Sequence, residues 1–207
     1  MGRTGWIAMV ALWGALMGPS DVAAEASATV TIHVRILDEV GLPANTVQQA
    51  QQETSRIFKS AGIALSWLTN EDSPAGTLMI KIVSTPLGSK GKKQNVLGIA
   101  PGSRTTRGRI AWLFYPRIAD LAEARHVDVS QFLGHVMAHE MGHLLLPFDS
   151  HAVIGLMKDS WDAHQTLLAS ARTLTFEPSQ AALIRARLRN SAGAEDKTEN
   201  GSALASR

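Results

Sequence analysis

The segment GHVMAHEMGHLLLPFDSHAVIGLM, from Gly134 to Met157, carries four of the seven histidines in this 207-residue chain. Its first half has apolar residues at helical spacing. Pro147 ends that pattern, because proline cannot continue a helix and disfavours helical geometry at the residue before it. We therefore predict a helix that ends near Leu146 and is followed by a turn. The chemistry of the segment depends on which histidines can approach one metal ion.

Within the predicted helix, His139 and His143 are four residues apart. They therefore share one face and lie about 6 Å apart along the axis, close enough to bind one zinc ion. Glu140 projects about 100° further round the helix, so its carboxylate can reach a metal-bound water without binding the metal. This is the His-Glu-x-x-His pattern of zinc peptidases, in which the glutamate is the general base. His135 lies about 12 Å from His143 along the axis, too far for both to bind one zinc ion. We therefore expect His135 to be packed, or to be hydrogen-bonded to a metal ligand without binding the metal.

A third protein ligand is expected, because catalytic zinc sites have three such ligands and leave the fourth position to water. Asp149 and His151 both follow the proline within easy reach. We predict His151, since neutral imidazole is a standard partner in three-histidine sites. Asp149 remains an alternative, either as the third ligand or as a group that orients a ligand histidine. Acids further along the chain rank below these two: Asp159, Asp162 and Glu177.

The stretch HEMGHLLLPFDSH followed by GLM resembles the metzincin clan of zinc metallopeptidases. That clan has the pattern His-Glu-x-x-His-x-x-Gly-x-x-His/Asp and a turn that contains a methionine. The chain is especially similar to a group of exported bacterial proteins with the pattern HExGHLLL…SHS…GIM…W. The resemblance implies a zinc site with these parts: ligands His139, His143 and His151, general base Glu140, and Met157 in the methionine turn.

The chain departs from the clan pattern in two places. Leu146 stands where the clan has glycine, whose tolerance of positive φ permits a tight turn. The clan spacing would also put the third ligand at Asp149, two residues before His151. A leucine followed by proline indicates a wider exit from the helix. Without the resemblance, Met157 would be interpreted as a residue that fills a gap in the core.

The rest of the chain predicts a layered α+β fold. Apolar alternation and turn residues predict strands at 28–38, 63–68, 77–83, 96–100 and 109–115. Helical spacing predicts a first helix, capped by Asn45 or Thr46 and ending near Gly62. Further helices are expected at 117–126, 130–146, with Asp128 or Ser130 as the cap, and 178–190. This order predicts an α+β or mixed α/β layer with the metal-motif helix packed on a sheet. The resemblance implies a zincin-like fold, with a twisted mixed sheet, an active-site helix and a small C-terminal subdomain in which Trp161 packs.

Three segments are expected along the chain. Residues 1–24 have a basic start, a short apolar run and then small residues, which is typical of a signal peptide. An uncleaved anchor is the alternative, although the apolar run is shorter than the roughly 20 residues of a spanning helix. Residues 27–190 form the zincin-like metallopeptidase domain, and residues 191–207 form a polar, disordered tail. We predict a secreted or periplasmic protein that folds without disulfides, because the chain has no cysteine.

These features together predict a zinc metalloendopeptidase, with Zn²⁺ as cofactor and a peptide or protein as substrate. An exported zinc-binding or protein-binding module without hydrolytic activity is the alternative, and an amidase acting on cell-wall peptides is a third interpretation. The formal charge of +2 and the absence of aromatic residues from the basic loops give no support to a nucleic-acid partner. We expect a monomer with no stable membrane association after signal cleavage.

Overall fold

The computed structural model describes residues 30–69, 73–87, 95–102 and 108–204. The predicted signal peptide at 1–24 lies outside the described residues, as do residues 205–207 of the predicted tail. Within the described ranges, no helix has both the length and the apolar character needed to cross a bilayer.

Five strands form one mixed sheet in the order β2-β1-β3-β5-β4. Their bounds are β1 (Val30–Asp38), β2 (Ile63–Leu68), β3 (Leu78–Val83), β4 (Gly98–Ile99) and β5 (Ile110–Phe114). The four longer strands are parallel to one another, whereas β4 pairs antiparallel with β5 at one edge of the sheet. Each strand lies within a range predicted from sequence, so the mixed α+β fold class is confirmed.

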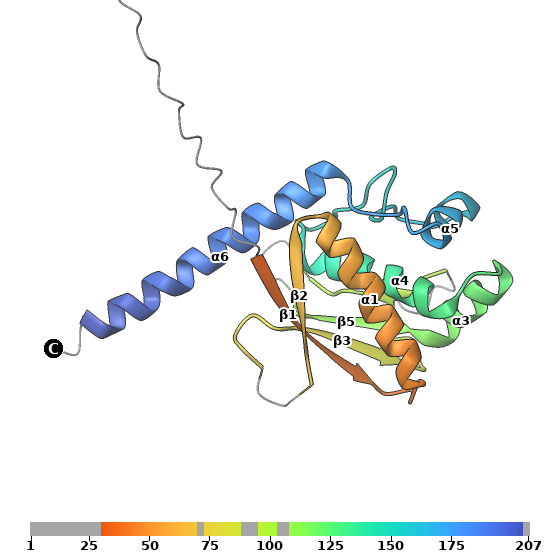
Figure 1. Ribbon diagram of the computed structural model, residues 1–207, viewed down its shortest axis with the longest axis horizontal. Coiled ribbons are helices and arrows are strands. Elements are labelled where there is room, and N and C mark those ends of the chain that lie inside the picture. The colour runs from red at the N-terminus through yellow and green to blue at the C-terminus, as the bar shows by residue number, and fades with distance from the viewer. Residues whose placement is uncertain (1–29, 70–72, 88–94, 103–107, 205–207) are drawn as a thin grey trace, which may run out of the picture.

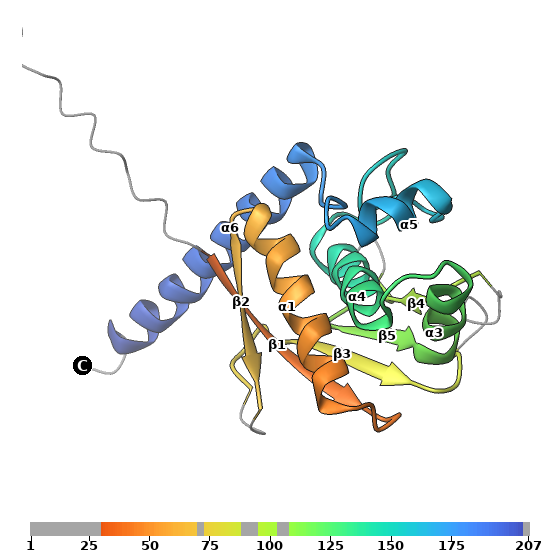
Figure 2. The same ribbon diagram turned by 45° about the vertical axis from the view of Figure 1, so that its right-hand side comes forward.

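The described residues include five helices: α1 (Ala44–Ser60), α3 (Tyr115–Ala124), α4 (Val129–Leu145), α5 (Ala163–Ser170) and α6 (Pro178–Leu204). Figures 1 and 2 show α1 and α4 side by side on the same face of the sheet. Parallel strands need a long crossover connection, and α1 supplies it between β1 and β2. The helix that carries the metal motif therefore packs on the sheet, as predicted.

The core lies between the sheet and these two helices. Alternate residues of the central strands point toward the helices and are buried, which is the two-residue period expected of a strand. The helices contribute apolar side chains at three- and four-residue spacing. Representative buried residues are Ile32, Val34, Ile80, Ile82, Leu113, Ile57, Phe58, Leu133, Met137 and Met141.

The first helix begins earlier than predicted, and the expected cap at Asn45 or Thr46 is wrong. The residue before the helix is Pro43, with φ −53° and ψ 135°, and no side chain caps this end. The Pro43 carbonyl accepts hydrogen bonds from the amides of Thr46 and Val47 at 2.9 and 3.4 Å. The rigid proline starts the helix, which leaves Asn45 and Thr46 inside its first turn. Gly62, with φ +74°, ends the helix as predicted.

Both ends of α4 are held by side chains. At the start, the Asp128 carboxylate accepts a hydrogen bond from the Gln131 amide at 2.8 Å, so Asp128 is the cap. At the end, Arg187 of α6 donates to the carbonyls of Leu144 and Leu145 at 3.1 and 2.6 Å. These carbonyls have no partner within the helix. Leu146 is extended, with φ −86° and ψ 166°, as expected before a proline.

The C-terminal part differs from the sequence prediction in two respects. Helix α5 lies in a segment for which no helix was predicted. Helix α6 runs to Leu204, so its backbone is helical over most of the range where a disordered tail is expected. Figure 1 shows α6 leaving the body of the molecule toward its C-terminal end. Trp161 packs against Phe132 of α4 with ring centroids 5.7 Å apart, as expected for a small subdomain attached to that helix.

A buried ionic cluster joins α1 to α4. Glu53 is 2% exposed, and its carboxylate accepts hydrogen bonds from Arg56 at 2.6 Å and from Arg172 at 2.9 Å. On α4, His135 is fully buried, with Nε2 3.3 Å from Glu53 Oε1. His135 Nδ1 donates to the carbonyl of Gln131 at 3.0 Å. His135 is therefore packed behind the metal-motif helix, in agreement with the sequence interpretation.

Replacing Glu53 with glutamine is expected to lower the free energy of unfolding by about 2 kcal/mol at pH 7, because it removes the buried carboxylate that accepts charged hydrogen bonds from Arg56 and Arg172. Burial alone raises the pKa of Glu53. The Arg56 hydrogen bond and the charges of His135, Arg56 and Arg172 outweigh burial, so the pKa lies below its ordinary value of 4.5. The stabilisation is therefore present above pH 4.5 and is lost as pH falls through the lowered pKa. Urea unfolding of both proteins at several pH values measures this difference.

The matched control is Glu39→Gln, which breaks the more exposed pair between Glu39 and Lys81 at 3.3 Å. This change is expected to cost less than about 1 kcal/mol. Equal losses in the two variants, or a Glu53→Gln loss that persists unchanged well below pH 4.5, would contradict the assignment of a buried ionic cluster.

Candidate metal centre

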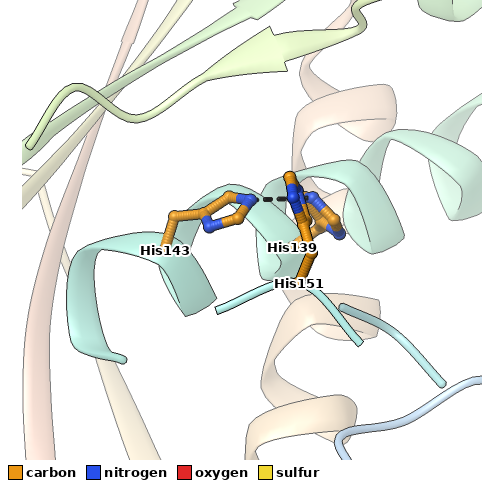
Figure 3. A group of neighbouring side chains, drawn as sticks. All are labelled: His139, His143 and His151. Carbon is orange, nitrogen blue, oxygen red and sulfur yellow. Dashed lines mark hydrogen bonds between the residues drawn. The ribbon is translucent and has the colours of Figure 1, made fainter. Parts of the chain in front are cut away.

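Three histidines from two parts of the chain meet beside the C-terminal half of α4. His139 and His143 lie one turn apart on the helix, and His151 comes from the segment after Pro147. One ligand atom from each lies within 4.8 Å of the other two, so the three side chains could hold a metal ion. In Figure 3 the His143 ring points at His139, and His151 approaches from its own segment. Among the described acids and histidines, Asp149 is not part of this group.

Each of the three imidazoles uses Nδ1 for a contact outside the group. His139 Nδ1 donates to the carbonyl of Leu156 at 2.7 Å. His143 Nδ1 lies 3.3 Å from the Ser150 hydroxyl, and His151 Nδ1 lies 3.3 Å from a carboxylate oxygen of Asp159. Partners of this kind fix the ring orientation and tautomer of a metal-binding histidine. With Nδ1 of each ring in these contacts, Nε2 is the nitrogen through which each histidine could bind a metal ion.

The two helical histidines bring their Nε2 atoms within 3.1 Å of each other. His139 carries its proton on Nδ1, because a carbonyl oxygen can only accept a hydrogen bond. Its Nε2 therefore presents a lone pair toward His143. Burial lowers the pKa of His139 to about 4, and the backbone hydrogen bond to Leu156 only partly opposes this effect. A neutral ring with its lone pair in the group is the form that binds a metal.

The turn after Pro147 explains why His151, and not Asp149, joins the group. Asp149 has φ +62°, the left-handed conformation that aspartate tolerates better than most residues. The positive φ expected of a glycine at position 146 thus occurs three residues later, at Asp149. The chain then continues through Ser150, and the Ala152 amide donates to the Met157 carbonyl at 2.8 Å. This path places His151 over the helical pair.

Glu140 lies on α4 directly after His139 and is 6% exposed. Burial raises the pKa of Glu140 to about 8. Its side chain packs against β4. A Cβ added at Gly98 would lie 2.8 Å from both Cγ and Oε1 of Glu140, so the close approach of this strand requires a glycine. The carboxyl group is therefore enclosed between the helix and the antiparallel edge strand.

Met157 packs under α4 and is fully buried. A Cβ added at Gly142 would collide with the Met157 sulfur and would lie 3.0 Å from Cε1 of Phe176. Glycine at this helical position lets the segment after His151 pack directly under the helix. The burial of Met157 agrees with its interpretation as a core residue.

Gly142→Ala is expected to lower the free energy of unfolding by about 1–2 kcal/mol, because overpacking at Met157 outweighs the better helix propensity of alanine. In a Met157→Ala background the collision is removed. The same change should then be neutral or stabilising by up to about 1 kcal/mol. Urea unfolding of the four metal-free proteins gives the coupling energy. Identical effects in the two backgrounds would show that Met157 does not pack on Gly142.

Sequence reasoning missed several residues of the site. Ser150 and the Leu156 carbonyl have no motif that could have revealed them. Asp159, a lower-ranked candidate ligand, lies outside the group and contacts His151. Asp162 caps α5 by accepting from the amides of His164 and Gln165. Its pKa is lowered to about 2, chiefly by a hydrogen bond from Lys158.

No protein-family model matches this chain, and no curated protein matches it.

Proposed function

We propose that this protein is a zinc-dependent endopeptidase with a metzincin-like fold. The observation that carries the proposal is the convergence of His139, His143 and His151 beside a buried glutamate on the same helix. Tetrahedral zinc with Zn–N distances of about 2.0–2.1 Å needs nitrogens about 3.3–3.4 Å apart. The 3.1 Å between Nε2 of His139 and Nε2 of His143 is close to this value. An all-imidazole ligand set also suits zinc.

Zinc bound by the three imidazoles would lower the pKa of its water and polarise the scissile carbonyl. Glu140 would act as the general base: it would take a proton from the attacking water and later donate it to the leaving amine. Burial raises the pKa of Glu140 to about 8, whereas a neighbouring cation favours the carboxylate form. With zinc bound, the two effects on the Glu140 pKa would oppose each other.

The position of β4 supports a peptide substrate. Among the residues that the structure describes, this strand lies at the edge of the sheet and pairs with β5 alone. Gly98 of β4 contacts the Glu140 side chain. An extended peptide added to the open edge of β4 would therefore run past the general base, which is the β-augmentation mode of peptide binding. We further propose that the protein is exported, acts as a monomer in the periplasm or medium, and does not bind nucleic acid.

The test uses purified, zinc-loaded protein incubated with casein and with a peptide library. Cleavage that stops on addition of a chelator and returns with zinc supports the proposal. Cleavage of isolated peptidoglycan without cleavage of proteins would instead identify an amidase. Zinc binding without hydrolysis of either substrate would identify a binding module.

A further inference from the structure

The carbonyl of Leu156 accepts hydrogen bonds from two side chains that are close together only in the fold. His139 Nδ1 donates to this oxygen at 2.7 Å, and the indole nitrogen of Trp161 donates at 3.3 Å. A carbonyl oxygen has two lone pairs and can accept both bonds at once. The metal-facing histidine and the tryptophan therefore share one acceptor.

The Trp161 ring lies along a single face of α4. Its centroid is 5.7 Å from that of Phe132, 6.5 Å from that of His135 and 5.6 Å from that of His139, each at an interplanar angle of at least 71°. Residues three and seven positions apart share one helical face. The indole is therefore held edge-on between rings of the helix that bears the metal motif, and this contact sets the direction of its N–H.

The backbone on both sides of the Leu156 carbonyl is also anchored. The Leu156 amide donates to the Thr175 carbonyl at 2.9 Å, and the Met157 carbonyl accepts from the Ala152 amide at 2.8 Å. Gly155, immediately before, has φ +77°, so the segment turns sharply at this point. The turn brings the Leu156 carbonyl under His139, and the Trp161 bond occupies the second acceptor direction of that oxygen.

We infer that Trp161 is a positioning residue for His139: its indole N–H holds the Leu156 carbonyl in the direction that keeps the His139 proton on Nδ1 and Nε2 available as a ligand. Neutral histidine has two tautomers, and the hydrogen bond at one nitrogen decides which nitrogen can bind a metal. The inference rests on the proposed role of His139 as a zinc ligand. It gives Trp161 an effect on zinc binding, although the Trp161 side chain is not itself one of the ligands.

The test removes the indole N–H and keeps the ring. Trp161→Phe is the first variant. In a second, 3-benzothienylalanine at position 161 preserves the indole shape and replaces N–H by sulfur, so packing is retained if phenylalanine disturbs the fold. The matched control is Trp67→Phe on strand β2, at the edge of the sheet opposite β4. It removes a similar hydrogen bond, which the Trp67 indole donates to the Ser55 hydroxyl at 2.9 Å.

Two measurements are made on each protein. Competition with a chromophoric chelator gives the zinc dissociation constant, which is expected to rise about tenfold in both position-161 variants and less than twofold in Trp67→Phe. Nitrogen-15 chemical shifts of metal-free protein give the tautomer of His139. The Nε2–H form should increase in the position-161 variants and stay at its original level in the control. A residue that only packs would not change this tautomer.

A threefold or greater loss of zinc affinity in the benzothienyl variant, together with a shift in the His139 tautomer, supports the inference. A smaller change in affinity, or an unchanged tautomer, overturns it. If the unmodified protein binds no zinc, the proposed function fails, whereas the tautomer of the metal-free protein still decides the role of Trp161.

Discussion

Glu140→Gln is expected to reduce kcat/KM for peptide hydrolysis about 1,000-fold while zinc stays bound. The amide keeps the size and polarity of the side chain but cannot take a proton from water, and general-base catalysis typically contributes factors of this order. The three histidines are untouched, so zinc content measured by mass spectrometry should equal that of the unmodified protein. The site is enclosed by Gly98 and α4, and glutamine fits the same space.

The control for this variant is Glu123→Gln, a change of the same kind at an exposed position on α3. It should retain full activity and zinc content. Glu140→Gln protein that hydrolyses peptides at the original rate would remove Glu140 as the base. Loss of zinc together with activity would instead assign Glu140 to metal binding.

His151→Ala is expected to weaken zinc binding by more than about 100-fold. Loss of a residue that only hydrogen-bonds to a metal ligand typically weakens metal binding by about 10- to 100-fold. Removal of a direct ligand should exceed that effect. The loss follows because only two of the three converging imidazoles would remain. Chelator competition measures it, and peptide hydrolysis should fall in parallel.

Asp149→Asn provides the decisive control, since Asp149 is the alternative third ligand. Asparagine tolerates the left-handed conformation found at Asp149, so the turn is preserved. It removes the negative charge that a carboxylate ligand would supply. Zinc affinity should stay within about threefold of the original, well below the loss expected at a direct ligand. A large loss in Asp149→Asn with little effect of His151→Ala would reverse the assignment of the third ligand.

Local sequence signals predicted much of the fold. The alternation of apolar residues in β1 and the apolar run in β5 predicted strands that the structure contains. Alternate residues of a strand point to the same face, so an alternating pattern buries one face of the sheet. Asp128 was one of two residues expected to cap α4, and it does so. The helix ends at Leu145, within one residue of the end predicted from Pro147. In each case the deciding interaction lies within a few residues of the chain.

Features set by distant contacts could not be predicted in the same way. Helix α5 is short, and its position depends on contacts such as the hydrogen bond from Gln131 of α4 to the Ala169 carbonyl at 2.7 Å. The partner of His135 proved to be Glu53, which lies on a different helix. No local pattern connects these residues.

In the candidate site, too, some residues follow from local sequence signals and others depend on contacts between distant residues. His139, Glu140 and His143 follow from helical spacing alone. The choice between Asp149 and His151 depended on the left-handed turn at Asp149 and on the backbone bond between Ala152 and Met157. Both arise from the path of the chain after the helix.

Anomalous diffraction at the zinc absorption edge, from crystals of protein purified without added metal, tests the central claim most directly. The prediction is one strong peak about 2.0–2.1 Å from Nε2 of each of His139, His143 and His151, with the Glu140 carboxylate outside bonding distance. A map without a peak among these nitrogens, or with rings that coordinate through Nδ1, would contradict the account.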